Sequence, residues 1–587
     1  MAVSAKSSRL CGTGALLLVG LLAACATQQA RDETVDNLRS PPAGAMRVDA
    51  RGRIGGELHY ALAGEPETFN YLAASENRSK LIALLTTGTL LEFDPVSQQV
   101  TGGAASDCRL EDEGRSVRLH LREGLAFSDG TPVSAEDVAF TFDRILDPNS
   151  HNVLKDSLMV GGEPLRVEIV NEHELIIHAA RPYAAIEYLL TTVPVLPLHC
   201  LATDAGRPIE EAWTLSTPPA DMAGLGPFTI VQHEAGISTT LRRNPHYWKI
   251  DSDGVQLPYL DRIVFEYVSD RSAQVLRLSS GALDLSDSLR PEDFILLKGR
   301  GDLVSENLGP SSSLSFLWFN LNRPEGVERT REFSWFSRRA FRQAVDAVVN
   351  REAIARTVYA GLASPAFGFV SSANRKWHVD LPVRPRSDLE AARELLRGAG
   401  FSWNQRAGVT QLFDRDGVPV AFQLLTSSDD VLGRMAAVIQ QDLADLGIHV
   451  DIRQEELRSV ISRVVHSRQY AAALTNLDFP MEPLDMANVL TSSGGLHIWK
   501  PPGGGAPTDW EAEVDGLMAE LATTLDPQDR FELFKQVQQI IARECPLIPL
   551  VNRNVLVVHR RSIRDLEVAR IFPYAWGRIW KVYREQP

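Results

Sequence analysis

The sequence predicts a mixed α/β fold, because strand-like and helix-like segments alternate along most of its 587 residues. Apolar and polar side chains alternate over residues 56–63 and 117–122, which is the two-residue period of a strand with one solvated face. In other segments the apolar residues recur at helical spacing. Helices are predicted over residues 339–349, 388–397, 431–446 and 527–542, and further strands over 422–425 and 448–453.

Two helix starts also carry capping signals. Ser134 and Asp137 form a capping-box pattern before an amphipathic stretch, so a helix is predicted there. A strand is predicted over residues 263–267. Asp270 follows it and can cap a helix that ends at Gly281.

The N-terminus has the order of an export signal. Lys6 and Arg9 supply positive charge, and an apolar core over residues 15–22 follows, too short to cross a bilayer. Leu22-Ala23-Ala24-Cys25 then resembles the lipobox of bacterial lipoproteins, whose cysteine takes a diacylglycerol. The alternative is an ordinary signal peptide with an incidental cysteine. We expect a lipid anchor at Cys25 on the extracytoplasmic face of a bacterial membrane, with inner or outer membrane left open.

Charge and hydropathy limit the partners of the remaining chain. Residues 27–50 are polar and aperiodic, which predicts a flexible linker, and no later segment approaches the roughly 20 apolar residues of a membrane helix. The formal net charge is −15, and loss of Lys6 and Arg9 with the signal peptide would make it −17. Such a charge argues against nucleic acid or anionic lipid as the main partner.

Motifs of common enzymes and metal sites are missing from the sequence. His173 and His178 are five residues apart in a strand-like segment, so they would face opposite sides and not share a zinc ion. No G-x-S-x-G elbow or phosphate-binding loop occurs. Cys108, Cys200 and Cys545 permit at most one disulfide, and their wide spacing predicts small buried hydrophobes rather than a metal or redox site. We therefore expect no enzyme, metal or cofactor.

An ordered series of motifs resembles one protein family. The longest match covers residues 119–138 and contains Phe127-Ser128-Asp129-Gly130-Thr131-Pro132. The other matches are Gly64-Glu65-Pro66-Glu67-Thr68-Phe69-Asn70, Gly226-Pro227-Phe228, Arg243-Asn244-Pro245-His246-Tyr247-Trp248, Pro258-Tyr259-Leu260-Asp261, Asn350-Arg351-Glu352-Ala353-Ile354 and Pro546-Leu547-Ile548-Pro549-Leu550. Over residues 54–580 the chain is similar to the family 5 extracellular solute-binding proteins, the oligopeptide-, dipeptide- and nickel-binding components of ABC importers.

The resemblance implies a periplasmic-binding-protein-like fold of two lobes (type II, cluster C), with an extra α/β domain in the first lobe. The ligand would be enclosed between the lobes by a hinge motion near Gly309 and Cys545, and an ABC permease would be the membrane partner of a monomer. The implied boundaries are a signal peptide over 1–24, the lipidated cysteine and linker over 25–50, lobe I over 51–91, 198–313 and 545–587, the extra domain over 92–197, and lobe II over 314–544.

The resemblance also suggests ligand-contacting residues. Asp478 lies before a proline-containing turn, where peptide-binding members carry an aspartate that pairs with the ligand's α-ammonium group. The alternative is an exposed turn aspartate, since Ala473 to Thr475 lack the aromatic residue that usually precedes it. Further candidates are a carboxylate partner, Arg375, and cleft-lining residues that include three tryptophans. The cleft-lining candidates are Trp318, Asn320, Trp377 and Trp499.

The expected function is capture of short peptides held in an extended conformation. Another solute, such as an oligosaccharide, a nickel chelate or an opine, is the alternative within the class. A sensory binding lipoprotein is the alternative outside transport.

Overall fold

The computed structural model describes residues 44–202, 207–322, 330–382, 388–406, 409–500 and 506–585. The predicted signal peptide and Cys25 lie outside these residues. The mixed α/β class is confirmed. The four helices predicted from periodicity are α9 (Arg339–Val348), α11 (Leu389–Gly398), α12 (Asp430–Asp445) and α16 (Pro527–Glu544). Among the described helices, none has the length and apolar character that crossing a membrane requires.

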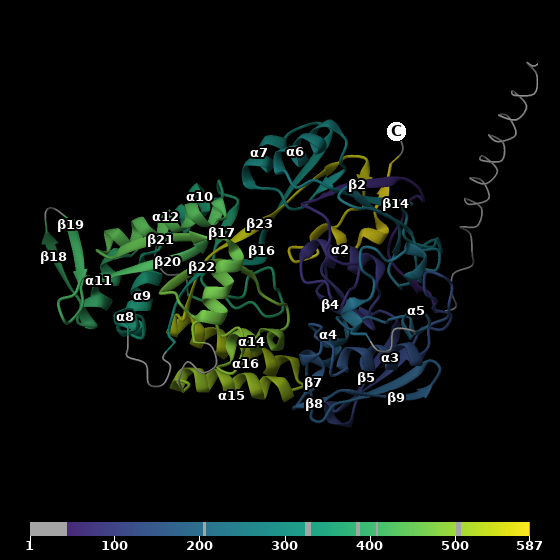
Figure 1. Cartoon of the computed structure of the whole chain (residues 1–587), viewed down its shortest axis with the longest axis horizontal. Coiled ribbons are helices and arrows are strands. Elements are labelled where there is room, and N and C mark those ends of the chain that lie inside the picture. Colours follow the sequence, from purple (N-terminus) through teal and green to yellow (C-terminus); the bar gives the residue numbers. More distant parts are fainter. Residues whose placement is uncertain are drawn as a thin grey trace, which may run out of the picture.

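One mixed sheet runs through both halves of the molecule (Figure 1). Within the described residues it has eleven strands, ten of them in the order β11-β12-β14-β2-β15-β23-β16-β22-β20-β21, and β17 pairs beside β23. Their bounds are β2 (Glu57–Leu62), β11 (Phe228–Glu234), β12 (Ser238–Arg243), β14 (Arg262–Tyr267), β15 (Leu285–Ser286), β16 (Leu303–Phe319), β17 (Ala363–Pro365), β20 (Ala421–Ser427), β21 (His449–Glu455), β22 (Ala472–Asp478) and β23 (Leu547–Arg560).

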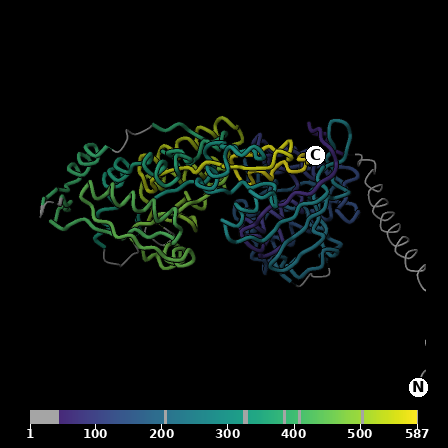
Figure 2. Tube along the Cα trace, turned by 90° about the horizontal axis from the view of Figure 1, so that it is seen from above, coloured from purple at the N-terminus to yellow at the C-terminus, as the bar shows by residue number. Residues whose placement is uncertain are grey.

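The two long strands β16 and β23 join two lobes, which lie side by side in Figures 1 and 2. In lobe I, residues 303–307 of β16 pair with residues 556–560 of β23, beside β15 and β2. In lobe II, residues 314–318 of β16 pair with residues 547–552 of β23, beside β22. The register shifts between these two halves, around Pro310 and Asn554. On β16 the crossing lies near Gly309. On the second strand it lies near Asn552, because residues 547–551 of β23 belong to the core of lobe II.

Lobe I contains a second sheet in the predicted extra domain. Its order is β5 (Ala105–Glu111), β6 (Ser116–Leu121), β10 (Glu174–His178) and β9 (Arg166–Asn171), and it is antiparallel throughout. Strand β10 covers the predicted strand segment from Glu174 to His178, and His173 lies in the turn before it. Helix α3 (Ala135–Leu146) begins with the predicted capping box of Ser134 and Asp137, and α6 (Arg271–Ser280) is capped by Asp270 and ends at Gly281.

The remaining elements complete the two lobes. Those of lobe I are β1 (Met46–Arg47), α2 (Asn77–Thr86), β3 (Leu91–Asp94), β4 (Gln99–Gly102), β7 (Met159–Val160), β8 (Glu163–Pro164), α4 (Ile186–Leu190), α5 (Leu198–Leu201), β13 (Lys249–Ile250), α7 (Pro291–Leu297), β24 (Ile563–Arg564), a 3-10 turn at Tyr574–Trp576, and β25 (Tyr583–Arg584). Those of lobe II are α8 (Arg331–Phe336), α10 (Arg351–Thr357), β18 (Ser402–Arg406), β19 (Val409–Phe413), α13 (Leu457–Ile461), α14 (Ala487–Leu490) and α15 (Asp509–Thr523).

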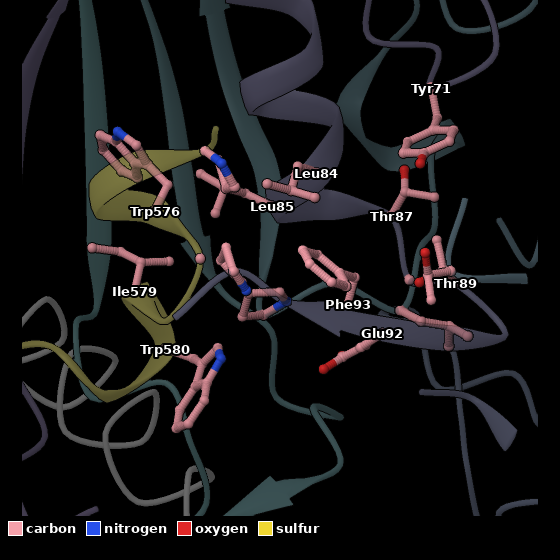
Figure 3. A pocket seen from close by; sticks show the side chains of 18 of the residues that line it. Tyr71, Leu84, Leu85, Thr87, Thr89, Glu92, Phe93, Trp576, Ile579 and Trp580 are labelled. Atoms are coloured by element: carbon pink, nitrogen blue, oxygen red, sulfur yellow. The ribbon is translucent and has the colours of Figure 1, made fainter. Parts of the chain in front are cut away.

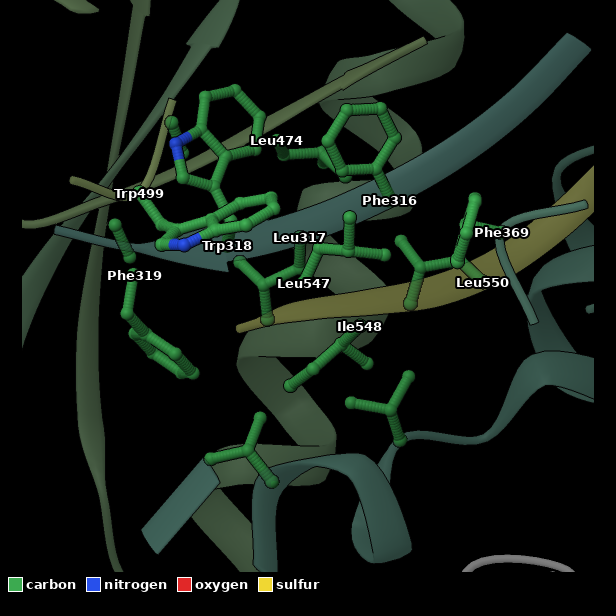
Figure 4. Packing of buried hydrophobic residues seen from close by; sticks show 14 of the residues in the cluster. Phe316, Leu317, Trp318, Phe319, Phe369, Leu474, Trp499, Leu547, Ile548 and Leu550 are labelled. Carbon is green, nitrogen blue, oxygen red and sulfur yellow. The ribbon is translucent and has the colours of Figure 1, made fainter. Parts of the chain in front are cut away.

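The core of lobe II forms around the strands that cross from lobe I. Apolar side chains of β16, including Phe316 and Trp318, pack against Leu547 and Ile548 of β23 (Figure 4). Because β16 and β23 enter this core, their ends in lobe II are fixed and polar residues can be tolerated at the crossing. The crossing is thus the place where the fold can present exposed polar side chains from both lobes.

Candidate functional site

Asp478 lies where β22 ends beside the crossing strands. It is the last residue of β22 and is paired with Ser313 of β16, while the next residue, Phe479, is buried against Phe316 and Phe369. This anchor fixes the strand end and leaves the Asp478 side chain exposed. Among the described residues, none donates a hydrogen bond to the Asp478 carboxylate or forms an ion pair with it. Asp478 therefore presents a carboxylate with unused hydrogen-bond acceptors at the lobe junction.

Arg553 faces this carboxylate from β23. Loss of solvation opposes the charge of its guanidinium, but interaction with Tyr574 and with the Asp478 carboxylate raises the guanidinium pKa above its usual value. Its Nη2 donates to the Tyr574 hydroxyl over 3.3 Å, and the side chain is exposed. Arg553 thus has donors left for a ligand.

Asp287 of lobe I contacts the turn that carries Tyr574. It is buried directly after β15 and accepts hydrogen bonds from the Tyr60 hydroxyl at 2.6 Å and from the backbone N–H of Ala575 at 3.3 Å. Burial raises the pKa of the Asp287 carboxyl. Because Ala575 follows Tyr574, this carboxylate positions the turn that carries Tyr574. We call Asp287, Asp478, Arg553 and Tyr574 the crossover cluster.

Small polar side chains form the floor beside the crossover cluster. The Ser315 hydroxyl donates to the Asn476 side-chain oxygen at 2.6 Å, and the Ser311 hydroxyl donates to the Arg553 carbonyl at 2.8 Å. Asn552 donates to the Ser313 carbonyl at 2.9 Å. These bonds hold the two crossing strands and β22 in register.

The edge of β22 is open next to Asp478. Strand β20 pairs with β22 only at Ala472 and Ala473, while β16 pairs along the whole other side. Beyond Leu474, whose carbonyl accepts the Thr426 hydroxyl at 3.1 Å, no described strand pairs with this edge. Asn476 and Leu477 are exposed there. The backbone from Thr475 to Asp478 can therefore accept an added strand.

The structure places the three predicted tryptophans in the core of lobe II. Trp318 is 2% exposed, Trp377 1% and Trp499 0%. The Trp318 indole N–H donates to the Tyr470 hydroxyl at 3.2 Å, and Trp377 packs edge-on against Phe534. Their burial follows from positions inside a packed α/β lobe, where large aromatic side chains contribute most apolar area.

Asn320 and Arg375 are occupied by other contacts. The Asn320 amide donates to the carbonyls of Arg468 and Tyr470, over 3.1 and 2.8 Å, and so braces the end of β16. Arg375 is exposed and reaches across to lobe I, where its Nη2 donates to the carbonyls of Val96 and Ser97 at 2.7 and 2.8 Å. Of the six predicted ligand contacts, only Asp478 is both exposed and without a partner among the described residues.

Gln98 adds two hydrogen bonds between the lobes next to Arg375. Its side chain donates to the Ala373 carbonyl at 2.6 Å and accepts the Arg375 N–H at 2.9 Å. Arg570 adds a bond to the Ser372 carbonyl at 2.8 Å. We call Gln98, Arg375 and Arg570 the lobe latch. It ties the β3–β4 turn of lobe I to a turn of lobe II.

A cavity of about 260 Å³ lies within lobe I, where Pro573 and Trp576, on either side of Tyr574, belong to its lining (Figure 3). Its lining includes the aromatic side chains of Tyr71, Phe93, Trp576 and Trp580. Glu92 and Lys249 form an ion pair of 2.5 Å at its lining. All of its lining residues belong to lobe I, so it does not need both lobes to form.

Sequence reasoning did not find Asp287, Arg553 or Tyr574. A signal was present for Arg553, because Asn552-Arg553-Asn554 interrupts an otherwise apolar strand. The contact between Arg553 and the Asp478 region joins β23 with β22 and depends on tertiary structure. The crossover cluster offers a carboxylate, a guanidinium and an open strand edge, which together suit reversible binding of a polar, strand-like ligand.

The chain is similar to known bacterial binding proteins. The model of the bacterial extracellular solute-binding proteins, family 5, matches residues 99–495. The probable ABC transporter periplasmic-binding protein SapA of Escherichia coli K12 is 23% identical, over 90% of this chain and 92% of SapA. Di/tripeptide-binding protein 3 of Pseudomonas aeruginosa is 24% identical, over 87% of this chain and 92% of that protein.

Solved structures share the fold. The oligopeptide-binding protein AppA of Bacillus subtilis, solved with a nonapeptide, has a TM-score of 0.71 and 21% identity, covering 91% of this chain and all of AppA. MelB of Agrobacterium fabrum, solved with stachyose, has a TM-score of 0.70 and 20% identity, covering 92% of this chain and 86% of MelB. These relatives are solute-binding proteins, not enzymes, and their ligands differ. The chain belongs to the family 5 bacterial extracellular solute-binding proteins, the substrate-binding components of ABC importers.

Proposed function

We propose that this chain binds short peptides between its lobes and delivers them to an ABC permease. The observation that carries the proposal is the exposed Asp478 carboxylate at the end of an open strand edge. Burial of a peptide ammonium group costs several kcal/mol unless a carboxylate replaces the lost water. Asp478 supplies that charge at the crossing of the lobes.

The open edge of β22 supports an extended ligand. A peptide strand placed beside Thr475 to Asp478 would exchange backbone hydrogen bonds with residues that have no strand partner on that side. Arg553, with donors in reserve, would bind a ligand carbonyl or carboxylate. Such contacts are made with the peptide backbone, so peptides with many different side chains would be bound. Buried Trp318, Trp377 and Trp499 do not offer the stacking faces that an oligosaccharide site uses.

Thermal unfolding with a ligand panel tests the ligand class. The panel contains di- and tripeptides, their N-acetylated forms, stachyose and a nickel–histidine chelate. A ligand that binds only the native state adds about 2.7 kcal/mol at a hundredfold excess over its dissociation constant. We expect free peptides to raise the melting temperature and acetylated ones to fail. A shift with stachyose or the nickel chelate alone would replace the peptide proposal.

The proposal includes a lipid anchor at Cys25, supported by the lipobox-like residues that follow an apolar core. Labelling cells with a fatty-acid probe checks it. Cys25→Ser should lose the label, whereas Cys11→Ser, within the signal peptide, should keep it. Label retained in Cys25→Ser would contradict the anchor and leave ligand binding unaffected.

A further inference from the structure

We propose that Asp129, His199 and Cys200 form a binding site for a divalent transition-metal ion of the zinc class on lobe I. One ligand atom from each residue lies within 4.8 Å of the other two. The His199 Nε2 is 2.7 Å from an Asp129 oxygen. Asp129 and His199 are exposed and Cys200 is partly exposed, so an ion can reach all three from solvent.

The scaffold holds both halves of this site in place. Asp129 lies in a tight turn in which Gly130 has a φ of 93°, and its second oxygen accepts the Thr131 N–H at 3.0 Å. The other half is α5, whose Leu198 N–H donates to Asp137 of the capping box at 3.0 Å. The ligands are therefore presented from two anchored segments, and only side-chain rotation is needed to bring them closer.

The Asp129 carboxylate is accessible to a cation. Among the described residues, no lysine or arginine pairs with Asp129; His199 is its ion-pair partner. A carboxylate, an imidazole and a thiol that converge in this way form a donor set that can hold a transition-metal ion.

The donor set points to the class of ion. Zinc binds cysteine sulfur at about 2.3 Å, histidine nitrogen at about 2.0 Å and carboxylate oxygen at similar lengths, with four ligands in all. Three protein donors leave one position for water. Calcium and magnesium prefer oxygen ligands and gain little from an imidazole and a thiol.

Cys108 provides a matched control. It is a second partly exposed thiol, and its pKa is raised to about 12 by burial and then by Glu187 and Asp107. In the described part of the chain, no cluster of three metal-ligand side chains includes it. If a thiol near carboxylates is sufficient for binding, the metal should bind at both cysteines. A metal that needs the imidazole as well should select Cys200.

The test uses the full-length protein under reducing conditions, with Co²⁺ as a spectroscopic probe and Zn²⁺ in calorimetry. We expect one thiolate-to-cobalt absorption band and one zinc per chain in the wild type and in Cys108→Ala. Both should be lost in Cys200→Ala, and His199→Gln should weaken zinc binding by at least about tenfold. Unchanged zinc binding in Cys200→Ala, or no binding by the wild type, would overturn the site.

A second measurement needs no variant. Maleimide labelling of the native protein, read by peptide mass spectrometry, should be slowed by Zn²⁺ at Cys200 and not at Cys108. Equal labelling rates with and without zinc at Cys200 would also overturn the proposal. Because the crossover cluster lies elsewhere, peptide binding should survive in Cys200→Ala, so failure of one proposal does not imply failure of the other.

Discussion

Glu511 illustrates how a buried carboxylate stays ionised in lobe II. It is 2% exposed at the start of α15. Burial opposes its charge, but hydrogen bonds from His497, Lys500 and the Thr508 N–H lower its pKa to about 2. The carboxylate therefore fixes both the helix start and the preceding loop.

Glu511→Gln should destabilise lobe II and change its acid sensitivity. The pKa of a glutamate is about 4.3 when unfolded, so this group contributes stability above that pH and loses it as the pH falls towards 2. Breaking the buried interaction should cost roughly 3–5 kcal/mol at neutral pH. Urea unfolding from pH 7 to pH 3 measures both effects. Glu513→Gln, exposed on the same helix, is the control and should change little. Equal loss of stability in both variants would contradict the assignment.

The exposure of Asp478 could be predicted from the sequence more easily than the burial of the tryptophans, for a physical reason. An aspartate before a proline turn is polar wherever the chain places it, so exposure at a strand end was predictable. A tryptophan is suited equally to a cleft wall and to a protein core, and only the packing of the folded chain decides between them. Here Trp318 on β16 and Trp377, which packs against α16, are both buried. Arg553, Tyr574 and the Asp129–His199–Cys200 group join segments far apart in sequence, so spacing could not reveal them. Wide cysteine spacing predicted burial, which holds for Cys545, whereas Cys108 and Cys200 are partly exposed.

At the scale of elements, the motif Gly226-Pro227-Phe228 has a packing explanation. A Cβ atom at Gly226 would lie 2.3 Å from the Leu85 carbonyl oxygen, and the Gly226 N–H donates to the Thr86 carbonyl at 3.1 Å. The end of α2 therefore packs directly on this backbone. Helix caps at Ser134 and Asp270 were predicted because capping depends on local residue type. The packing of the end of α2 against the start of β11 was not predicted, because it depends on a contact between segments that are far apart in the sequence.

Gly226→Ala should destabilise the protein, because backbone atoms of α2 cannot move aside cheaply. Gly516→Ala is a matched control. Gly516 lies inside α15 with open space around it, so alanine there should stabilise by about 0.5–1 kcal/mol. Thermal unfolding should move the two variants in opposite directions. A neutral Gly226→Ala would mean that α2 and β11 are not packed as described.

At the scale of the whole molecule, the lobe latch is one of the contacts that join the lobes besides the crossing strands. Arg375 makes its bonds to the carbonyls of Val96 and Ser97, both in lobe I. A role in holding the lobes together differs in its consequences from direct contact with a ligand carboxylate.

Arg375→Ala distinguishes these two roles. If Arg375 acts as part of the latch, the substitution should weaken binding of a free peptide and of its C-terminally amidated form by the same factor, since both need the same lobe arrangement. If Arg375 pairs with the ligand carboxylate, the substitution should weaken the binding of the free-acid peptide only. Calorimetry with both peptides decides, and Gln98→Ala should reproduce the pattern of a latch variant. A selective effect on the free acid would return Arg375 to the ligand site.

The central claim, that Asp478 binds the α-ammonium group of a peptide, is tested most directly by calorimetry in four combinations. Wild type and Asp478→Asn are each titrated with one peptide in its free and N-acetylated forms; Asp451→Asn, on β21, is the control. Loss of a buried charge partner costs roughly 3–5 kcal/mol, so the free peptide should bind Asp478→Asn more than about a hundredfold more weakly. Acetylation should weaken binding to the wild type by a similar factor and add little in the variant. Equal affinities in all four combinations would contradict the account.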